Sequence, residues 1–349
     1  MQPDAIPAGL ARMLPGLRVA ALTLLFFLLA ASGFFLLIGQ PPLRLFADLA
    51  AYAFGDAYSI SESLVKAVPI LFCALAVAVP ARLGLISVGA DGQLYAGAIA
   101  GTALVLAWTA APMALLLPAM LLAGAAGGAA FGGIAGWLRA RLGVNETIVT
   151  LLLNFIGLLL VNFLVYGPWK DPGNQGWPAT IPFPDAATVP HLFGTRAHLG
   201  LLLAVAAAIA LHLAVTMTRW GLVLAVLRGN ARVGRMVGLA FGRNALLVFL
   251  IGGAMAGLAG IAETSAIQGR LQPGLSAGYG LTGFLVAWLA GHHFLRIVPL
   301  AVIAGGLLAA GDTLQLFAKV PAASTIVLQA LLFIAALAAS GLQRRRVAS

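Results

Sequence analysis

Polar side chains stand inside a long apolar stretch from Gly84 to Gly101, which reads GLISVGADGQLYAGAIAG. The carboxylate of Asp91 and the amide of Gln93 are costly at membrane depth, so groups of this kind usually face a protein interior or an aqueous path. Glycines break the apolar segment around them. This stretch is therefore the first candidate for a site that handles a polar solute.

Further amides mark the apolar stretch from residue 146 to 166. Asn154 and Asn162 are eight residues apart, just over two helical turns, and so lie near one face of a helix. Amides in lipid-embedded helices either form hydrogen bonds to neighbouring helices or line a solute path. Both interpretations stay open from the sequence.

Enzymatic chemistry has little support in this chain. His292 and His293 stand together, but no further histidine or carboxylate cluster has a spacing that would support metal binding or acid–base catalysis. Cys73 is the only cysteine, so neither a disulfide framework nor a cysteine metal site is available. No Gly-x-x-x-x-Gly-Lys-Ser/Thr phosphate loop is present. We expect no catalytic residue, no metal ligand and no cofactor in this chain.

The elements that carry these residues must lie in lipid. Hydrophobic residues make up 62% of the chain and charged residues 9%, with a mean hydropathy of +1.03. An ordinary soluble domain has about 25% charged residues. The net charge of +10 comes from basic residues scattered between apolar segments, so orientation in a membrane explains it better than nucleic-acid binding.

A helix needs about 20 apolar residues to cross a bilayer, and by that measure the region 17–340 holds ten candidate spans. They cover residues 17–38, 62–80, 85–107, 113–137, 146–166, 199–218, 245–267, 280–291, 297–317 and 322–340. The eighth is too short to cross alone and, with the Gly/Pro-rich stretch from Gln272 to Gly280, predicts a broken or re-entrant element. We expect an all-α transmembrane bundle of nine or ten spans, as a single domain over 1–349.

The distribution of basic residues predicts the orientation of the bundle. With an even number of spans and a cytoplasmic amino terminus, 14 of the 20 basic residues fall inside, as the positive-inside rule favours. These are Arg12, Arg18, Arg82, Arg139, Arg141, Arg219, Arg228, Arg232, Arg235, Arg243, Arg296 and Arg344 to Arg346. The others, Arg44, Lys66, Lys170, Arg196, Arg270 and Lys319, fall outside or at the outer edge. Both termini are then cytoplasmic.

Glycine patterns predict close packing and an internal repeat. Glycine recurs every four residues over 124–136 and again at Gly253 and Gly257, a spacing typical of tightly packed membrane helices. GADGQLYA at 89–96 aligns with GLTGFLVA at 280–287 in four of eight positions. Paired glycine-interrupted segments are expected of transporters built from inverted repeats, and chance or shared packing explains so short a match equally well.

Two polar segments are long enough for a role beyond turning the chain. Residues 167–198 lie outside and form either a connecting loop or a cap that docks a soluble partner. Residues 219–243 lie inside and carry five arginines and no acid, interleaved with apolar residues. That spacing suits short amphipathic helices. The arginines either only orient the chain in the membrane or, as their number favours, form a docking surface for an acidic cytoplasmic partner.

Four segments together resemble the permease subunits of bacterial ABC importers in the branched-chain amino acid/simple sugar group. They are GLISVGADGQLYAGA, NETIVTLLLNFIGLLLVNFLV, AVLRGNARVGRMVGLAFGRN and GGAMAGLAGIAE. They occur in family order, and the resemblance runs from about residue 62 to 340. It is strongest to the nucleoside branch, which works with a BMP-type lipoprotein binding protein.

The resemblance implies a complex in the lipid bilayer of the bacterial plasma (inner) membrane. Its other members would be a second, distinct permease, a cytoplasmic ABC ATPase that binds ATP and Mg, and an external solute-binding lipoprotein. We expect no nucleic-acid partner. The ATPase would bind a coupling helix within 228–238. Its contact residues would be Arg228, Asn230, Arg232, Arg235 and Gly238. The family usually has Asn-Pro where this chain has Asn230-Ala231, and proline favours the first turn of a helix, so the start of that helix is in question.

A site for an uncharged nucleoside should offer amides, hydroxyls and aromatic faces. We expect the solute path to be bordered by Asp91, Gln93, Tyr95, Asn154, Phe155 and Trp288. Trp288 is either a base-stacking group or an ordinary packing residue. A sugar or another solute of the same group is the alternative cargo, and an ion-coupled secondary transporter with Asp91 as ion ligand is the alternative mechanism.

Overall fold

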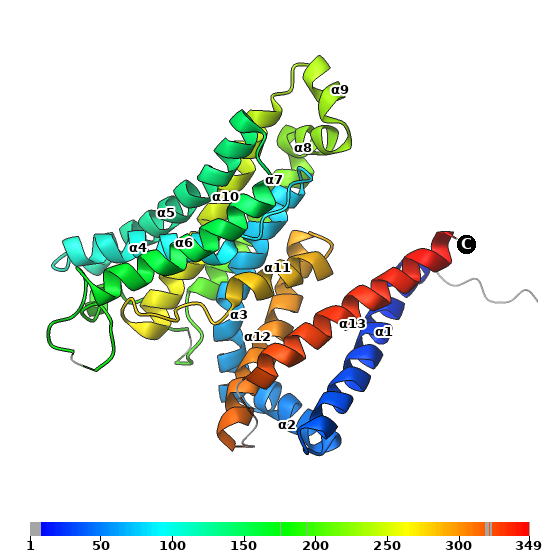
Figure 1. The fold of residues 1–349 in the computed structure, drawn as a ribbon, viewed down its shortest axis with the longest axis horizontal. Coiled ribbons are helices and arrows are strands. Elements are labelled where there is room, and N and C mark those ends of the chain that lie inside the picture. Colours follow the sequence, from blue (N-terminus) through cyan, green and yellow to red (C-terminus); the bar gives the residue numbers. More distant parts are fainter. Residues whose placement is uncertain (1–7, 175, 193, 318–320, 322, 349) are drawn as a thin grey trace, which may run out of the picture. The chain divides into compact units, whose positions relative to one another are not determined.

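The structure is a computed structural model that describes residues 8–174, 176–192, 194–317, 321 and 323–348 (Figure 1). Within this part the chain is built of helices, and the extended pairing is one isolated bridge between His191 and His198. The predicted all-α fold is confirmed. Lys319 lies outside the described residues, as do the side chains of Arg12 and of Arg344 to Arg346.

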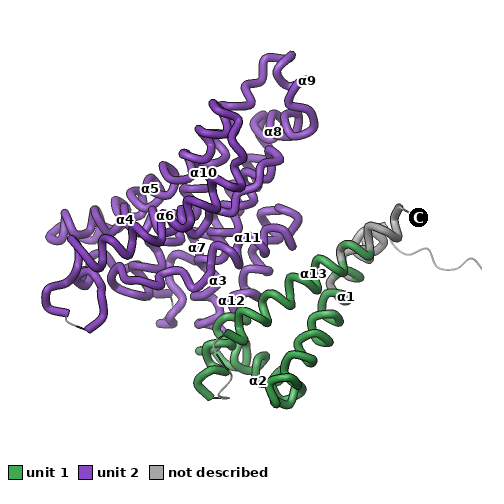
Figure 2. The backbone as a smooth tube through the Cα atoms, in the orientation of Figure 1, with its two compact units in different colours: residues 1–59, 307–349 green, residues 60–306 purple. Residues whose placement is uncertain are grey.

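The chain forms two compact units, residues 60–306 and residues 1–59 with 307–349 (Figure 2). The smaller unit contains α1 (Ala8–Leu37), α2 (Pro42–Phe54) and α13 (Ala323–Ala348). The unit boundary falls within α12 (Phe294–Phe317). The single domain expected from the sequence stays a prediction.

An apolar core holds the smaller unit together. Phe35 of α1 is fully buried there, with the ring of Phe46 edge-on to it at 5.4 Å between centroids. The helix α2 was not expected, because its 13 residues are shorter than a bilayer crossing. Gly39, with a φ of +74°, turns the chain between α1 and α2, which meet at an angle of 115°.

The larger unit carries the motifs that the sequence singles out. Its helices are α3 (Ala57–Ala81), α4 (Ala90–Ala107), α5 (Met113–Leu142), α6 (Glu146–Tyr166), α7 (Gly200–Met217), α8 (Arg219–Gly229), α9 (Ala231–Met236), α10 (Phe241–Glu263), α11 (Tyr279–Leu289) and the first half of α12. A 3-10 turn (Asp185–Ala187) and a π turn (Thr264–Gln268) lie in its connections. α3 is buried on all sides from Ala67 to Pro80, as expected of a helix that is apolar all round.

The ten apolar stretches predicted as spans are all mainly helical. Among the described residues, six helices are long and apolar enough to cross a membrane alone, and the bent pair α1–α2 would make a seventh. The helix α11 and the apolar part of α13, Ala323–Ala339, are shorter. The chain is a multi-pass helical bundle, and the count of nine or ten spans stays a prediction.

Glycine brings three helices of the larger unit into backbone contact. A Cβ atom on Gly128 of α5 would lie 2.2 Å from the carbonyl oxygen of Gly253 in α10, and one on Gly257 would lie 2.2 Å from that of Gly124. On α4, a Cβ on Gly97 would fall on the backbone of Gly257. Any larger side chain at these crossings would force the helices apart. The glycine stripe read from the sequence is therefore the contact surface of α5 and α10.

Substituting valine for Gly128 should destabilise the folded protein, because the new side chain meets a carbonyl that cannot rotate away. Overpacking of this kind costs about 1–3 kcal/mol or more, so the midpoint of thermal unfolding in detergent should fall by several degrees. Gly33→Val is the matched control, since nothing lies within 4 Å of a Cβ at Gly33. Equal midpoints for the two variants would contradict this packing.

Candidate functional site

The polar motif in the third predicted span is a break between two helices. α3 ends in a turn where Gly84 has a φ of +82° and Leu85 N–H donates to the carbonyl of Pro80 at 3.1 Å. Residues 85–89 then run without helical structure, and α4 begins at Ala90 rather than at the predicted position 85. Backbone groups at membrane depth must find hydrogen bonds within the protein, so this break needs partners.

Polar side chains on one face of α6 supply them. Ile86 N–H donates to Glu146 Oε1 at 3.3 Å, and Val88 N–H donates to Thr150 Oγ1 at 3.1 Å. Asn154 Nδ2 donates to the carbonyl of Val88 at 2.8 Å. We call Glu146, Thr150 and Asn154 the α6 ladder. Two residues of the extended break span about 6.6 Å, and four residues of the α6 helix span about 6 Å. Every second residue of the break can therefore face every fourth residue of α6.

The half-helices that follow irregular segments are capped by side chains from neighbouring helices. α4 has no side-chain cap of its own, and Gly92 N–H in its first turn donates to Asn154 Oδ1 at 2.7 Å. α11 also lacks one, and Gly280 N–H donates to Asp91 Oδ1 at 2.9 Å, where Ser276 Oγ donates as well. Each cap satisfies a free N–H group at a helix start. Asn154 thus ties α6 to α4, and Asp91 ties α4 to α11.

The two aligned octapeptides occupy similar local settings, each at the start of a half-helix. A Cβ on Gly92 would meet the carbonyl of Leu153 in α6 at 2.7 Å, and one on Gly283 would meet Cys73 in α3 at 2.6 Å. In both cases glycine permits a close approach to a longer helix. The inverted repeat itself stays a prediction.

The other residues predicted to border the solute path fall into two groups. Gln93 and Tyr95 are only 2% and 6% exposed, and Gln93 Nε2 lies against the glycine contact near Gly132. Phe155 and Trp288 expose 60% and 44% of their surfaces. Gln93 and Tyr95 are therefore enclosed by the protein in this structure, whereas Phe155 and Trp288 keep exposed ring surface.

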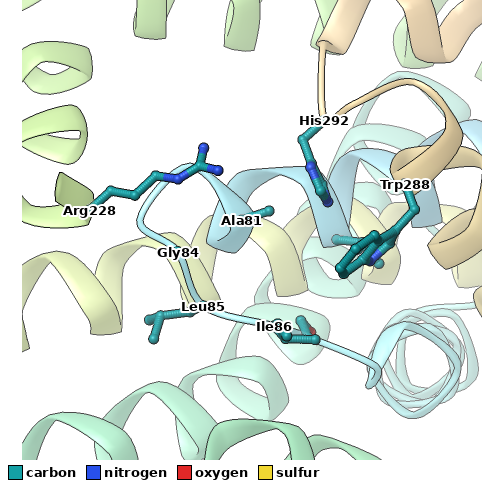
Figure 3. A pocket seen from close by; sticks show the side chains of 9 residues that line it. Ala81, Gly84, Leu85, Ile86, Arg228, Trp288 and His292 are labelled. Atoms are coloured by element: carbon teal, nitrogen blue, oxygen red, sulfur yellow. The ribbon is translucent and has the colours of Figure 1, made fainter. Parts of the chain in front are cut away.

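Trp288 lines a cavity of about 190 Å³ at the break (Figure 3). Arg228 of α8 reaches over the turn at Gly84 from one side, and Trp288 and His292 lie on the other side. The rings of Trp288 and His292 meet edge to face at 5.2 Å between centroids. His292 has a φ of 60°, uncommon for a residue other than glycine. Sequence reasoning missed this cluster, because its members are far apart in the chain.

The connection between α6 and α7, which we call the cap, lies at the end of the larger unit opposite α8 and is hydrogen-bonded to neighbouring segments (Figure 1). Thr180 N–H donates to the carbonyl of Leu271 at 3.0 Å. Arg196 forms an ion pair with Glu62 at 2.9 Å, and its backbone N–H donates to Ser61 Oγ. Because these bonds reach α3 and the segment after α10, the connection is more than a free loop. Docking of a soluble partner there stays a proposal.

The predicted coupling segment forms α8 and α9. Asn230 caps α9 with its side-chain oxygen, which accepts the N–H groups of Arg232 at 2.9 Å and Val233 at 3.2 Å. The cap fixes the start of the helix that the missing proline had put in question. Gly238, with a φ of +81°, ends the segment.

α9 packs on α8 and leaves a basic and apolar surface free. Gly234 is buried, and a Cβ there would lie 2.5 Å from the side chain of Leu227. Arg232 and Arg235 are exposed, and Met236 is 79% exposed beside them. These residues form the α9 surface, which carries positive charge and apolar area together.

Replacing Asn154 with alanine should leave Gly92 N–H and the carbonyl of Val88 without partners. A buried unsatisfied group costs about 1–3 kcal/mol, so the thermal midpoint in detergent should fall clearly. Asn162→Ala, two turns further along the same helix, is the control and should change it little. Equal effects of the two variants would show that the α6 ladder does not hold the break.

The cap should make the stability of the folded protein depend on pH through His198. The ring is fully buried, and Gly200 N–H donates to its Nδ1 at 3.2 Å, which requires a neutral ring. Burial, followed by the nearby His191, lowers the pKa of His198 from 6.5 to about 4. The unfolded chain binds a proton in this window and the folded chain does not, so the thermal midpoint should fall as the pH is lowered from 6.5 towards 4. His198→Asn keeps an acceptor without titrating and should flatten the slope; an unchanged slope would contradict this assignment.

Comparisons with known proteins agree with these features. Residues 59–337 match the family described as the permease component of the branched-chain amino acid transport system. The chain is 35% identical to the glucose ABC transporter permease of Haloferax volcanii, over 98% of this chain and 91% of that one. It is 31% identical to the guanosine ABC transporter permease of Bacillus subtilis, over 73% and 74% of the two chains. The nucleoside ABC transporter permease of Lactococcus lactis is 28% identical, over 82% and 81%.

The matched range contains the break, the α6 ladder, the cap and the α9 surface. The resemblance read from the four sequence segments is confirmed. The chain therefore belongs to the branched-chain amino acid transport permease family and is a multi-pass permease subunit of an ABC importer.

Proposed function

We propose that the importer carries nucleosides, with simple sugars as the second candidate. The names of two relatives, a guanosine and a nucleoside permease, support the first cargo, and the glucose permease supports the second. Both classes are uncharged and rich in hydroxyl groups, and nucleosides add a flat base. The exposed rings of Trp288 and Phe155 favour a solute with such a base, because apolar and aromatic faces dominate sites of this kind.

The observation that carries the ATP-driven mechanism is the α9 surface. It presents exposed arginines and apolar side chains on a short capped helix, and the chain has no phosphate loop of its own. A surface of this composition suits an acidic groove on a partner protein. That partner would be a cytoplasmic ABC ATPase, which would bind ATP and Mg.

Orientation follows from the two ends of α7. The cap precedes this helix and α8 follows it. Since α7 has 18 residues, the cap and α8 lie at ends about 27 Å apart. With most basic residues inside, α8, α9 and both termini lie in the cytoplasm and the cap faces outward. The cap would receive an external solute-binding lipoprotein, and a distinct second permease would complete the path in the plasma membrane.

The mechanism needs no covalent chemistry in this chain. Closure of the ATPase on ATP would push α9, which moves with α8 through the contact of Gly234 with Leu227. The caps by Asn154 and Asp91 join α6, α4 and α11, so these helices would rock together and open the path alternately to each side. Trp288 would offer its exposed ring to the solute along that path.

Uptake by right-side-out reconstituted vesicles, with ATP enclosed in the lumen and the solute-binding lipoprotein outside, tests the cargo. With the whole complex in their membrane, these vesicles should accumulate labelled guanosine or uridine, and excess glucose should not compete. An ATPase partner without its phosphate-loop lysine should abolish uptake. Accumulation of glucose without nucleoside would replace the first cargo with the second, and uptake without ATPase activity would contradict the mechanism.

Charge reversal of Arg232 and Arg235 to glutamate should uncouple ATP hydrolysis from uptake. Both side chains are exposed, so insertion and folding should be unaffected, while repulsion from an acidic partner should reduce uptake by at least about tenfold, a change of 1.4 kcal/mol in coupling. The double variant Arg141→Glu with Arg296→Glu carries the same charge change at exposed positions outside residues 219–243 and serves as control. Uptake unchanged by the α9 variant, or equally reduced by the control, would contradict the docking role.

A further inference from the structure

A second cavity, of about 340 Å³, adjoins the first through Arg228. It is lined by Arg82, Val215, Gly221, Leu224, Ala225, Arg228 and Gly229. No acidic residue lines either cavity in the described part of the chain. The larger cavity therefore gathers two guanidinium groups and an apolar wall, with no carboxylate to balance them.

Within the described residues, two nitrogen atoms around these cavities lack hydrogen-bond partners. Arg82 Nε and His292 Nε2 are buried and have no hydrogen-bond partner among the described residues. The guanidinium of Arg82 lies 4.9 Å from the ring centroid of Phe294. Burial, followed by the charge of Arg228, lowers the pKa of Arg82. Buried donors without acceptors are costly, and like charges held together need a counter-ion.

The charged groups around His292 repeat the same pattern. Burial lowers the pKa of His292 most, and the positive charges of Arg228, Arg82 and His293 lower it further. Glu146 bonds the N–H of Ile86, which lines the smaller cavity, but its carboxylate is paired with Arg139 at 3.3 Å. This acid is already engaged and does not neutralise the arginines.

The position of the larger cavity corresponds to the edge of a membrane. It lies where α3 ends at Ala81, α7 ends at Met217 and α12 begins at Phe294. The helix α8 folds back tightly on α7 at this level, since a Cβ on Gly221 would overlap the carbonyl of Val215. The ends of bilayer-crossing helices lie near the depth of lipid headgroups, and basic pockets between such helices suit anionic lipids.

We propose that Arg82 and Arg228, with His292 beside them, bind a phosphate oxyanion, and that its source is the headgroup of an anionic phospholipid. The planar forks of two guanidinium groups match the oxygens of a phosphate. The side chains of Val215, Leu224 and Ala225 would contact the glycerol and the first acyl carbons. Arg228 stands between the cavities, with its guanidinium over the turn at Gly84 (Figure 3), so a bound headgroup would connect α8 to the break. This site is independent of the identity of the transported solute.

Thermal unfolding of the detergent-purified complex tests the site. The probes are dihexanoyl phosphatidylglycerol, dihexanoyl phosphatidylcholine and inorganic phosphate, each titrated alone. Phosphatidylglycerol should raise the midpoint in a saturable way, and Arg228→Gln should weaken its apparent affinity by about tenfold or more, through loss of charge-assisted bonds. Arg228 is exposed, so this variant should fold. Arg82→Gln with Arg228→Gln should remove the effect.

Arg219→Gln, an exposed arginine of α8 that lines neither cavity, is the matched control and should leave the shift unchanged. Stabilisation by phosphatidylglycerol above phosphatidylcholine, lost only in the Arg228 variants, would support the lipid source. Equal stabilisation by inorganic phosphate, with the same dependence on Arg228, would support the oxyanion site and identify free phosphate as its source. No shift with any probe, or equal loss in the Arg219 variant, would overturn the proposal.

Discussion

A chain surrounded by lipid cannot leave its backbone N–H and C=O groups unpaired, and the break at residues 85–89 is where this constraint applies most strongly. The α6 ladder meets it with three side chains at four-residue spacing. Two of them accept the N–H groups of Ile86 and Val88, and Asn154 donates to the carbonyl of Val88. The constraint also applies to α4 and α11, which begin at glycines that have no capping side chain. Asn154 and Asp91 supply those caps from neighbouring helices.

Glycine makes these hydrogen bonds geometrically accessible. Gly92 lets the start of α4 approach α6 closely enough for the cap from Asn154, and Gly280 does the same where α11 meets Asp91. The crossings of α5 with α10 at Gly128 and Gly257 fix the helices behind them. The resulting frame has little room for independent motion of one helix, which suits a permease whose helices would move as a group under the proposed mechanism.

The sequence predicted the elements well and the roles of side chains less well. Hydropathy located all ten apolar stretches, because their lengths follow from bilayer thickness, but it missed α2, which is too short for that measure. Glycine spacing predicted the contact of α5 with α10. Asp91 and Asn154 were expected at the solute path, and in the structure both form caps, since spacing alone does not separate a lining residue from a helix contact.

Features that depend on distant segments lay beyond sequence reasoning. The cavities bring Arg82, Arg228 and His292 together from three places in the chain. From the sequence, Arg82 is only an orienting charge, Arg228 a coupling residue and His292 half of an isolated histidine pair. The start of α9 was in question because proline is absent, yet Asn230 caps it locally. A local rule, the preference of asparagine for helix caps, would have settled that point.

Hydrogen–deuterium exchange of the purified complex tests most directly whether the break is held by its hydrogen bonds to α6. Peptides covering residues 82–93 should exchange as slowly as those of α3, because the amides of Ile86, Val88 and Gly92 donate to the α6 ladder. Exchange of this segment as fast as that of an exposed loop would contradict the account, since the frame that joins α6, α4 and α11 would then not persist in solution.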